Sequence, residues 1–237
     1  MNFDSSDHLP SHPQILVVKL SSLGDLFHAL PAVHNLKEVL HAGITWVTQI
    51  PYVELVHCFT DVEKVISFHR DAFFKNLPDF IKELRAEPYD LIVDFQGIWK
   101  SAITTRLARG KRRIGPSFYR EGTRILYSAV AGQRNKERHA VIENLDIIHH
   151  LKIPLLPVEF PMRFPQYEVN MPHPRIALIP FSRWPSKNWA LSSFFEVGRN
   201  IYNQCHASIF LIGVSQDAHK CGKLACPFPA VNLIGKL

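Results

Sequence analysis

The chain has 237 residues, of which 46% are hydrophobic and 20% charged, and its formal net charge is +6. This length suits one large or two modest α/β domains. No apolar run approaches the roughly 20 residues of a membrane-spanning helix, and residues 1–13 are polar and acidic, unlike a signal peptide. The four cysteines lack metal-site spacing, so neither a disulfide framework nor a zinc site is indicated. We therefore expect a soluble protein of the cytoplasm.

Apolar runs and helical patterns alternate along the first part of the chain. The apolar runs predict strands over residues 15–20, 44–47, 64–68, 89–94 and 111–114. The helical periodicities predict helices over residues 26–40, 52–58, 73–86, 101–108, 122–131 and 139–151, the first irregular at Pro31. This alternation is typical of a doubly wound parallel sheet, whose sites lie beyond the carboxyl ends of the strands.

A change in composition follows at residues 154–174, which contain six prolines and predict an extended connector. Beyond it we expect strands over 175–180, 208–214 and 231–234 and helices over 190–203 and 216–224. These elements make only half of a doubly wound domain. The predicted organisation is a polar tail (1–13), an N-terminal domain (14–153), the connector (154–174) and a partial C-terminal domain (175–237).

The first predicted strand leads into a small polar turn that ends in a carboxylate. Ser21, Ser22 and Gly24 make the turn, and Asp25 comes directly before the apolar-rich helical segment. The partial positive charge of a helix N-terminus favours an ionised carboxylate, so Asp25 is a candidate general base. The alternative is that Asp25 only caps the helix.

Basic residues are concentrated between residues 101 and 138, with only Glu121 and Glu137 opposing them. An anionic partner is the natural interpretation, and a solvated basic face without a ligand remains the alternative. Nucleic acid is the weaker option, because no nucleic-acid-binding motif is present. The basic residues are Arg106, Arg109, Lys111, Arg112, Arg113, Arg120, Arg124, Arg134, Lys136 and Arg138.

Four blocks of sequence resemble the lipopolysaccharide heptosyltransferases, glycosyltransferase family 9, in order and approximate spacing. They are KLSSLGD from Lys19, DFQGIWKS from Asp94, HAVIEN from His139 and SRWPSKNW from Ser182. The resemblance implies a GT-B architecture of two Rossmann-like domains with parallel sheets, the first for a lipid-linked acceptor and the second for a nucleotide-sugar donor. It implies transfer of L-glycero-D-manno-heptose from ADP-heptose to the Kdo region of lipid A, with inversion. It further implies no metal or other cofactor, and a place at the inner face of the inner membrane.

The resemblance also implies roles for individual residues. Asp25 matches the general base, and Lys187 matches a donor-binding lysine, with Ser182 and Arg183 on the same loop. Each of three residues has a structural alternative. Lys187 could be an ordinary surface lysine, Lys19 a structural partner of Asp25, and His139 a structural hydrogen-bonding residue. Gly97 permits close backbone approach or makes a plain turn. The candidate acceptor-binding residues are Lys19, Ser22, Gly24, Arg70, Gln96, Gly97, Lys100, Arg120, Arg124 and His139.

The second half departs from the family pattern. An Asp-Thr-Gly-x-x-His block that contacts the donor in the family is not found. Residues that differ from the small or hydroxyl residues usual in the donor loop are Phe181, Arg183, Trp184 and Pro185. The expectation is a truncated donor domain, or a remainder supplied by a partner chain. The alternative function is a non-catalytic remnant or acceptor-binding module of the same family.

Overall fold

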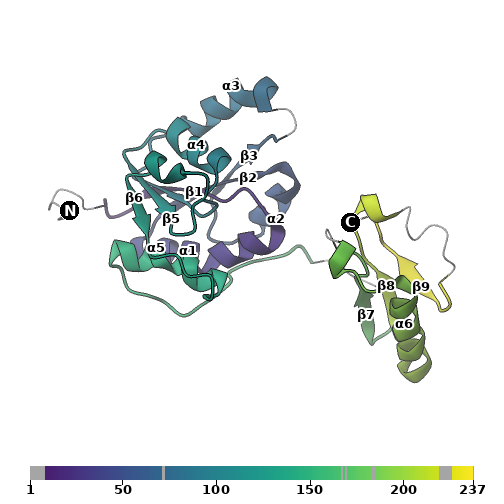
Figure 1. Ribbon diagram of the computed structural model, residues 1–237. Coiled ribbons are helices and arrows are strands. Elements are labelled where there is room, and N and C mark those ends of the chain that lie inside the picture. Colours follow the sequence, from purple (N-terminus) through teal and green to yellow (C-terminus); the bar gives the residue numbers. More distant parts are fainter. Residues whose placement is uncertain are drawn as a thin grey trace. The chain divides into compact units, whose positions relative to one another are not determined.

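The computed structural model describes residues 9–70, 73–166, 168, 170–182, 185–218 and 226–236. The chain divides into two compact units, Met1–Pro165 and Gln166–Leu237. Each contains its own parallel sheet (Figure 1). The predicted α/β class with parallel sheets is confirmed.

The sheet of the first unit has six parallel strands in the order β3-β2-β1-β4-β5-β6. This is the strand order of a doubly wound fold, in which the chain reverses direction across the sheet between β1 and β4. A crevice at the carboxyl ends of these two strands is therefore the expected place for a site. The strands are β1 (Gln14–Val18), β2 (Gly43–Gln49), β3 (Lys64–Phe68), β4 (Leu91–Asp94), β5 (Arg112–Pro116) and β6 (Ala129–Ala131).

Alternate side chains of β1 enter two separate cores. Ile15 and Val17 pack with apolar residues of helices α1 and α5, whereas Leu16 and Val18 pack with Phe80 and neighbouring residues on the other face. Figure 1 shows α1 and α5 on one side of the sheet and α3 and α4 on the other. Burial on both faces explains why β1 is a continuous apolar run. The helices are α1 (Leu23–Leu40), α2 (Val53–His57), α3 (Phe73–Leu84), α4 (Trp99–Leu107) and α5 (Ala140–Leu151), with 3₁₀ turns η1 (Ile50–Tyr52) and η2 (Thr123–Leu126).

The helix predicted over residues 122–131 is wrong. Gly122 has a left-handed backbone, with φ of 72°, and begins only the short turn η2. The chain then forms β6, which pairs in parallel with β5. The apolar residues after η2 thus extend the sheet by one edge strand.

The proline-rich segment after α5 is fastened to the first unit over much of its length. The amide of Leu156 donates to Asn35 Oδ1 at 2.8 Å. Pro161 O accepts from the amide of Thr60 at 3.2 Å, and the amide of Arg163 donates to Cys58 O at 2.7 Å. The division between the units therefore falls after Pro165, inside the predicted connector.

The second unit has three parallel strands in the order β7-β8-β9 and one long helix, α6 (Leu191–Cys205). Its core holds Phe195 of α6 with Ile209 and Leu211 of β8. The predicted helix over 216–224 is not tested beyond its start, because residues 219–225 lie outside the described residues and Ser215–Asp217 form the 3₁₀ turn η4. The remaining elements are β7 (Arg175–Leu178), η3 (Pro185–Lys187), β8 (Ser208–Leu211) and β9 (Ala230–Asn232).

Within the described residues, the helices are too short or too polar to cross a bilayer.

Candidate active site

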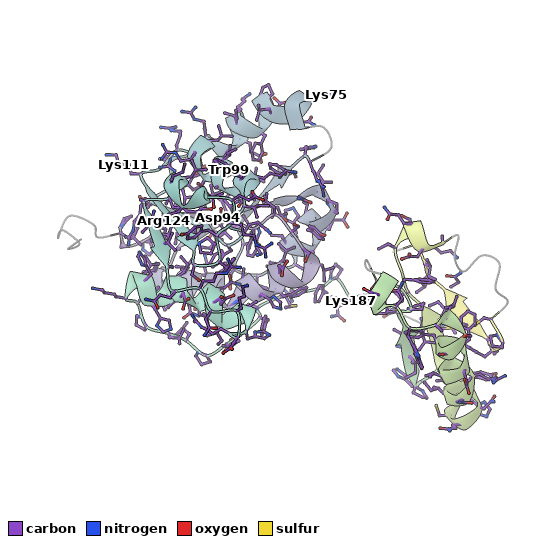
Figure 2. The ribbon with its side chains drawn as sticks, in the orientation of Figure 1. Lys75, Asp94, Trp99, Lys111, Arg124 and Lys187 are labelled. Carbon is purple, nitrogen blue, oxygen red and sulfur yellow. The ribbon has the colours of Figure 1, made fainter. Side chains whose placement is uncertain are left out.

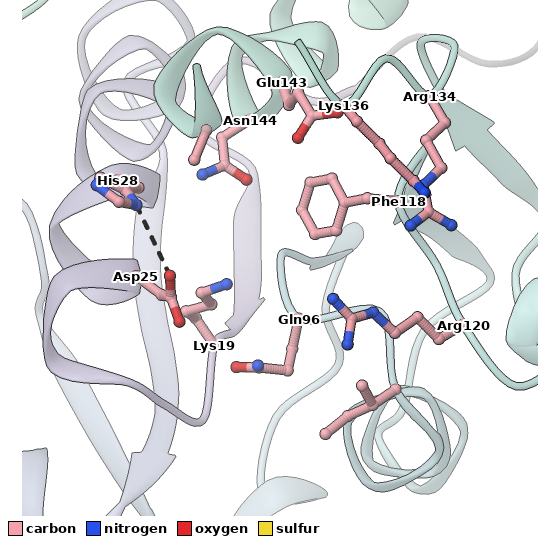
Figure 3. Close-up of a pocket in the computed structure, with 12 residues that line it drawn as sticks. Lys19, Asp25, His28, Gln96, Phe118, Arg120, Arg134, Lys136, Glu143 and Asn144 are labelled. Atoms are coloured by element: carbon pink, nitrogen blue, oxygen red, sulfur yellow. Dashed lines mark ion pairs between the residues drawn. The ribbon is translucent and has the colours of Figure 1, made fainter. Parts of the chain in front are cut away.

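A pocket of about 650 Å³ lies in the first unit, beyond the carboxyl ends of the parallel strands (Figure 3). Segments that follow β1, β4, β5 and β6 contribute to it, as does the first turn of α5. It thus occupies the crevice that the strand order predicts. The lining residues are Lys19, Asp25, His28, Gln96, Ile98, Phe118, Arg120, Arg134, Lys136, Ala140, Glu143 and Asn144.

Asp25 stands in the first turn of α1, as the sequence predicts, but the N-cap residue of the helix is Ser22. Asp25 Oδ2 accepts hydrogen bonds from the Ser22 amide at 3.0 Å and the Ser22 hydroxyl at 2.8 Å. Partial burial works to raise the pKa of Asp25, but these two bonds and the charges of Lys19 and His28 outweigh it and hold the pKa below its usual value. The carboxylate is consequently ionised at neutral pH and has Oδ1 free of Ser22.

Lys19 is almost completely buried, at 5% exposure, directly after β1. Its Nζ donates to Phe95 O at 2.7 Å. Burial lowers the pKa of Lys19, whereas the carboxylates of Asp25 and Asp94 act to raise it. A cation held between two carboxylates stabilises their ionised forms. Lys19 therefore lines the pocket and is also an electrostatic partner of Asp25, so its two predicted roles are compatible.

The turn after β4 is held by the fully buried Asp94. Asp94 Oδ1 accepts from the amides of Gln96 at 2.7 Å and Gly97 at 3.1 Å, and Oδ2 accepts from the Tyr127 hydroxyl at 2.7 Å. Burial raises the pKa of Asp94 against the effect of these bonds. Gly97 has φ of +69°, and a Cβ there would lie 3.0 Å from Tyr119 Cα. The turn therefore requires glycine at this position.

The same turn fixes Gln96 against the end of β1. Gln96 Oε1 accepts from the amides of Leu20 and Ser21, both at 3.1 Å. These bonds join the two loops at the reversal point of the sheet. Gln96 thus positions the segment that leads to Asp25, in addition to lining the pocket.

Several lining residues were not predicted individually as site residues, among them His28 and also Asn144, which ends the HAVIEN block. His28 Nδ1 is 3.7 Å from Asp25 Oδ1, one helical turn along α1. Among the described residues, His28 Nδ1 and Asn144 Oδ1 are both buried without a hydrogen-bond partner. Buried polar atoms of this kind favour a ligand that supplies the missing bond. The i, i+3 spacing of Asp25 and His28 was the available signal for His28.

The outer part of the pocket is basic. Arg120, Arg134 and Lys136 line it from segments that follow β5 and β6, with Glu143 as an acidic neighbour (Figure 3). Arg120 was predicted individually, whereas Arg134 and Lys136 were recognised only as part of the basic run. This wall suits carboxylate or phosphate groups.

Some of the other predicted acceptor-binding residues contact Asp25 or His28, and others do not line the pocket. Ser22 holds Asp25, and the ring of His139 packs 5.4 Å from that of His28 while His139 Nδ1 accepts from the amide of Val141. Gly24 is exposed in the first turn of α1. The predicted acceptor-binding residues that do not line the pocket are Ser22, Gly24, Arg70, Gly97, Lys100, Arg124 and His139.

The predicted donor residues belong to the second unit. Lys187 is exposed in η3, and the amide of Ser182 donates to Asn188 Oδ1 at 2.7 Å, which closes the loop between them. Arg183 lies outside the described residues.

One group of potential metal ligands is found among the described residues. Ligand atoms of His34, Glu38 and Asp61 lie within 4.8 Å of one another. His34 Nδ1 is already hydrogen-bonded to Asp61 Oδ2 at 2.9 Å. None of the three lines the pocket, so they have no part in the chemistry around Asp25.

Comparisons with known proteins identify the family of the chain. The family profile of glycosyltransferase family 9 (heptosyltransferase) matches residues 78–237. Lipopolysaccharide heptosyltransferase 1 of Escherichia coli K12 is 33% identical over 141 residues, which are 54% of this chain and 44% of that protein. The Pseudomonas aeruginosa enzyme of the same name is 25% identical over 247 residues, with 94% and 68% covered.

Solved structures are similar in fold. E. coli heptosyltransferase WaaC with ADP-2-deoxy-2-fluoro heptose has a TM-score of 0.73 and 24% identity, over 93% of this chain and 76% of that one. A family 9 transferase from Veillonella parvula has a TM-score of 0.79 and 15% identity, over 98% and 72%.

The sequence match to the E. coli relative covers less than half of that protein's length. The family profile nevertheless matches well over half of this chain. The chain therefore belongs to glycosyltransferase family 9, the heptosyltransferases.

Proposed function

We propose that this protein transfers L-glycero-D-manno-heptose from ADP-heptose to the Kdo region of a lipid A-type acceptor, with inversion. The observation that carries the proposal is the ionised carboxylate of Asp25 inside a basic pocket at the reversal point of the sheet. The names of the relatives support the substrates, because one is a lipopolysaccharide heptosyltransferase and another was solved with an ADP-heptose analogue.

Asp25 acts as the general base in this proposal. An acceptor hydroxyl attacks the anomeric carbon of heptose, the bond from that carbon to ADP breaks, and the hydroxyl proton goes to the base. Because Ser22 occupies Oδ2, we assign Oδ1 as the proton acceptor. General-base catalysis of this kind contributes ~10²- to 10⁴-fold. A single displacement with one base gives inversion.

Both substrates are anionic, and cationic side chains bind each of them. The basic wall of Arg120, Arg134 and Lys136 binds the carboxylates and phosphates of the acceptor. Lys187 binds the diphosphate and stabilises the negative charge that gathers on ADP as it leaves. The proposal needs no metal or other cofactor, and it places the protein at the inner face of the inner membrane, next to its lipid-linked acceptor.

Mass spectrometry of the acceptor tests this function. With ADP-heptose and a Kdo-bearing lipid A, the acceptor should gain the mass of one heptose, and NMR should show inversion at its anomeric carbon. Asp25→Asn should reduce transfer by ~10²- to 10⁴-fold, whereas Asp79→Asn, at an exposed position of α3, should not.

Two results would count against the proposal. Near-normal transfer by Asp25→Asn would remove Asp25 as the base. Binding of the acceptor by the wild-type chain without any product would favour the acceptor-binding module instead.

A further inference from the structure

Large apolar side chains are exposed on α4 and on the neighbouring turn η2. Trp99 and Ile103 are 40% and 43% exposed, and they stand one helical turn apart on the same face of α4. Ile125 of η2 is 79% exposed, and η2 packs against α4. We call Trp99, Ile103 and Ile125 the apolar face. Exposed apolar side chains that gather in this way mark a contact surface for an apolar partner.

Basic side chains surround the apolar face. Arg106 continues the stripe of Trp99 and Ile103 along α4, Lys100 is the next residue after Trp99, and Arg124 comes directly before Ile125. All three are exposed, and Trp99 and Arg124 are labelled in Figure 2. One carboxylate, that of Glu121, accepts a bond from the Trp99 amide at 3.3 Å. The net charge of this surface is therefore positive, which is complementary to an anionic layer.

The apolar face is adjacent in sequence to residues that line the pocket. Ile98, the residue before Trp99, lines the pocket, and so does Arg120. The amide of Arg120 donates to Gly97 O at 2.8 Å, which ties the loop before η2 to the turn before α4. An amphiphile with its sugar head in the pocket can thus keep its acyl chains on the side of Trp99.

We propose that the apolar face and its basic neighbours dock the protein on the surface of an anionic lipid bilayer. Trp99, Ile103 and Ile125 enter the interfacial region, and Lys100, Arg106 and Arg124 contact the headgroups. Tryptophan beside isoleucine, surrounded by cations, has the chemistry of an interfacial membrane contact. The inference rests on the proposed function in one respect, that the acceptor is embedded in this bilayer.

Co-sedimentation with vesicles, without acceptor or donor, tests the docking. The full chain should bind vesicles of phosphatidylglycerol and phosphatidylcholine in equal parts, and it should bind phosphatidylcholine alone much more weakly. Salt should reduce the binding. Trp99→Ser with Ile103→Ser should weaken it roughly tenfold, and Arg106→Gln about fivefold. The matched control is Ile142→Ser, an exposed isoleucine of α5 at 45% exposure, which should leave the binding unchanged.

Clear outcomes would overturn the proposal: no binding by the wild-type chain, or equal binding by the double variant and the wild type. Circular dichroism reports whether the double variant folds, and Ile125→Ser repeats the test if it does not.

Asp25→Asn distinguishes this proposal from the proposed function, because it should bind vesicles normally while losing transfer. The double variant should still transfer heptose to a water-soluble acceptor without acyl chains. Vesicle binding without transfer would contradict only the proposed function, and transfer without vesicle binding would contradict only the docking.

Discussion

The two units share a plan of parallel strands but differ in how deeply they bury the groups around their predicted functional residues. In the first unit, a six-stranded sheet has a core on both faces, and Lys19 and Asp94 are buried at the ends of its strands. Lys19 lowers the pKa of Asp25, and Asp94 holds the turn that carries Gln96. In the second, a three-stranded sheet has one core cluster, and Lys187 is exposed on a short turn. The proposed base, Asp25, thus has neighbours that lower its pKa, whereas the proposed donor-binding lysine, Lys187, is exposed to solvent.

Hydrogen exchange should show the largest difference between the units. The amides of β1 and β4 lie in the middle of the six-stranded sheet, so they should exchange only through global opening of the first unit. We expect the free energy of opening at β9, an edge strand of three residues, to be lower by several kcal/mol. Mass spectrometry of deuterated peptides measures both. Equal protection would show that the second unit is as stable as the first.

A pair of glycine substitutions tests how tightly the pocket turn is built. Gly97→Ala should lower the free energy of unfolding of the first unit by about 1 to 3 kcal/mol, because φ is positive and Cβ would meet Pro116 and Tyr119. Gly24→Ala is the control, since its Cβ would meet no atom within 4 Å. Urea unfolding measures both variants. Similar effects of the two would contradict the requirement for glycine at position 97.

Lys187→Ala tests whether the exposed lysine of the second unit binds ADP. Loss of one charged hydrogen bond should weaken ADP binding by about 1.5 to 3 kcal/mol without changing the stability of either unit. Calorimetric titration with ADP gives the affinity, and Lys236→Ala, an exposed lysine of the same unit, is the control. Unchanged ADP affinity in Lys187→Ala would remove this lysine from the donor site.

The smallest expected effect is a shift in the pH dependence of transfer. Ser22→Ala removes the hydroxyl that donates to Asp25 and helps to lower its pKa, so the pKa of Asp25 should rise. Protonation then begins at higher pH, and the acidic limb of the rate profile should move upward. Ser21→Ala is the control. An unmoved limb would show that the Ser22 hydroxyl does not contribute to the low pKa of Asp25.

The parts of the structure that could be predicted from sequence are those with local causes. The apolar run of β1, the polar turn after it and the helix beginning at Leu23 are neighbours in the chain, so their order alone indicates a carboxylate at the end of a strand. Gly97 was recognisable for the same reason, because it follows Asp94 within one turn.

The parts that could not be predicted depend on contacts between distant residues. Residues 122–131 have a helical apolar pattern, but the Tyr127 hydroxyl donates to Asp94, 33 residues earlier, and β6 pairs with β5. Asn144 reaches the pocket only because α5 packs against α1. No spacing within one segment carries that information.

The fastening of the proline-rich segment sets the length of the tether between the units. Because Leu156, Pro161 and Arg163 are bonded to the first unit, the chain between Pro165 and β7 is reduced to residues 166–174. A stretch of this length reaches at most ~30 Å when fully extended. These nine residues therefore set the upper limit on the distance between Pro165 and the start of β7.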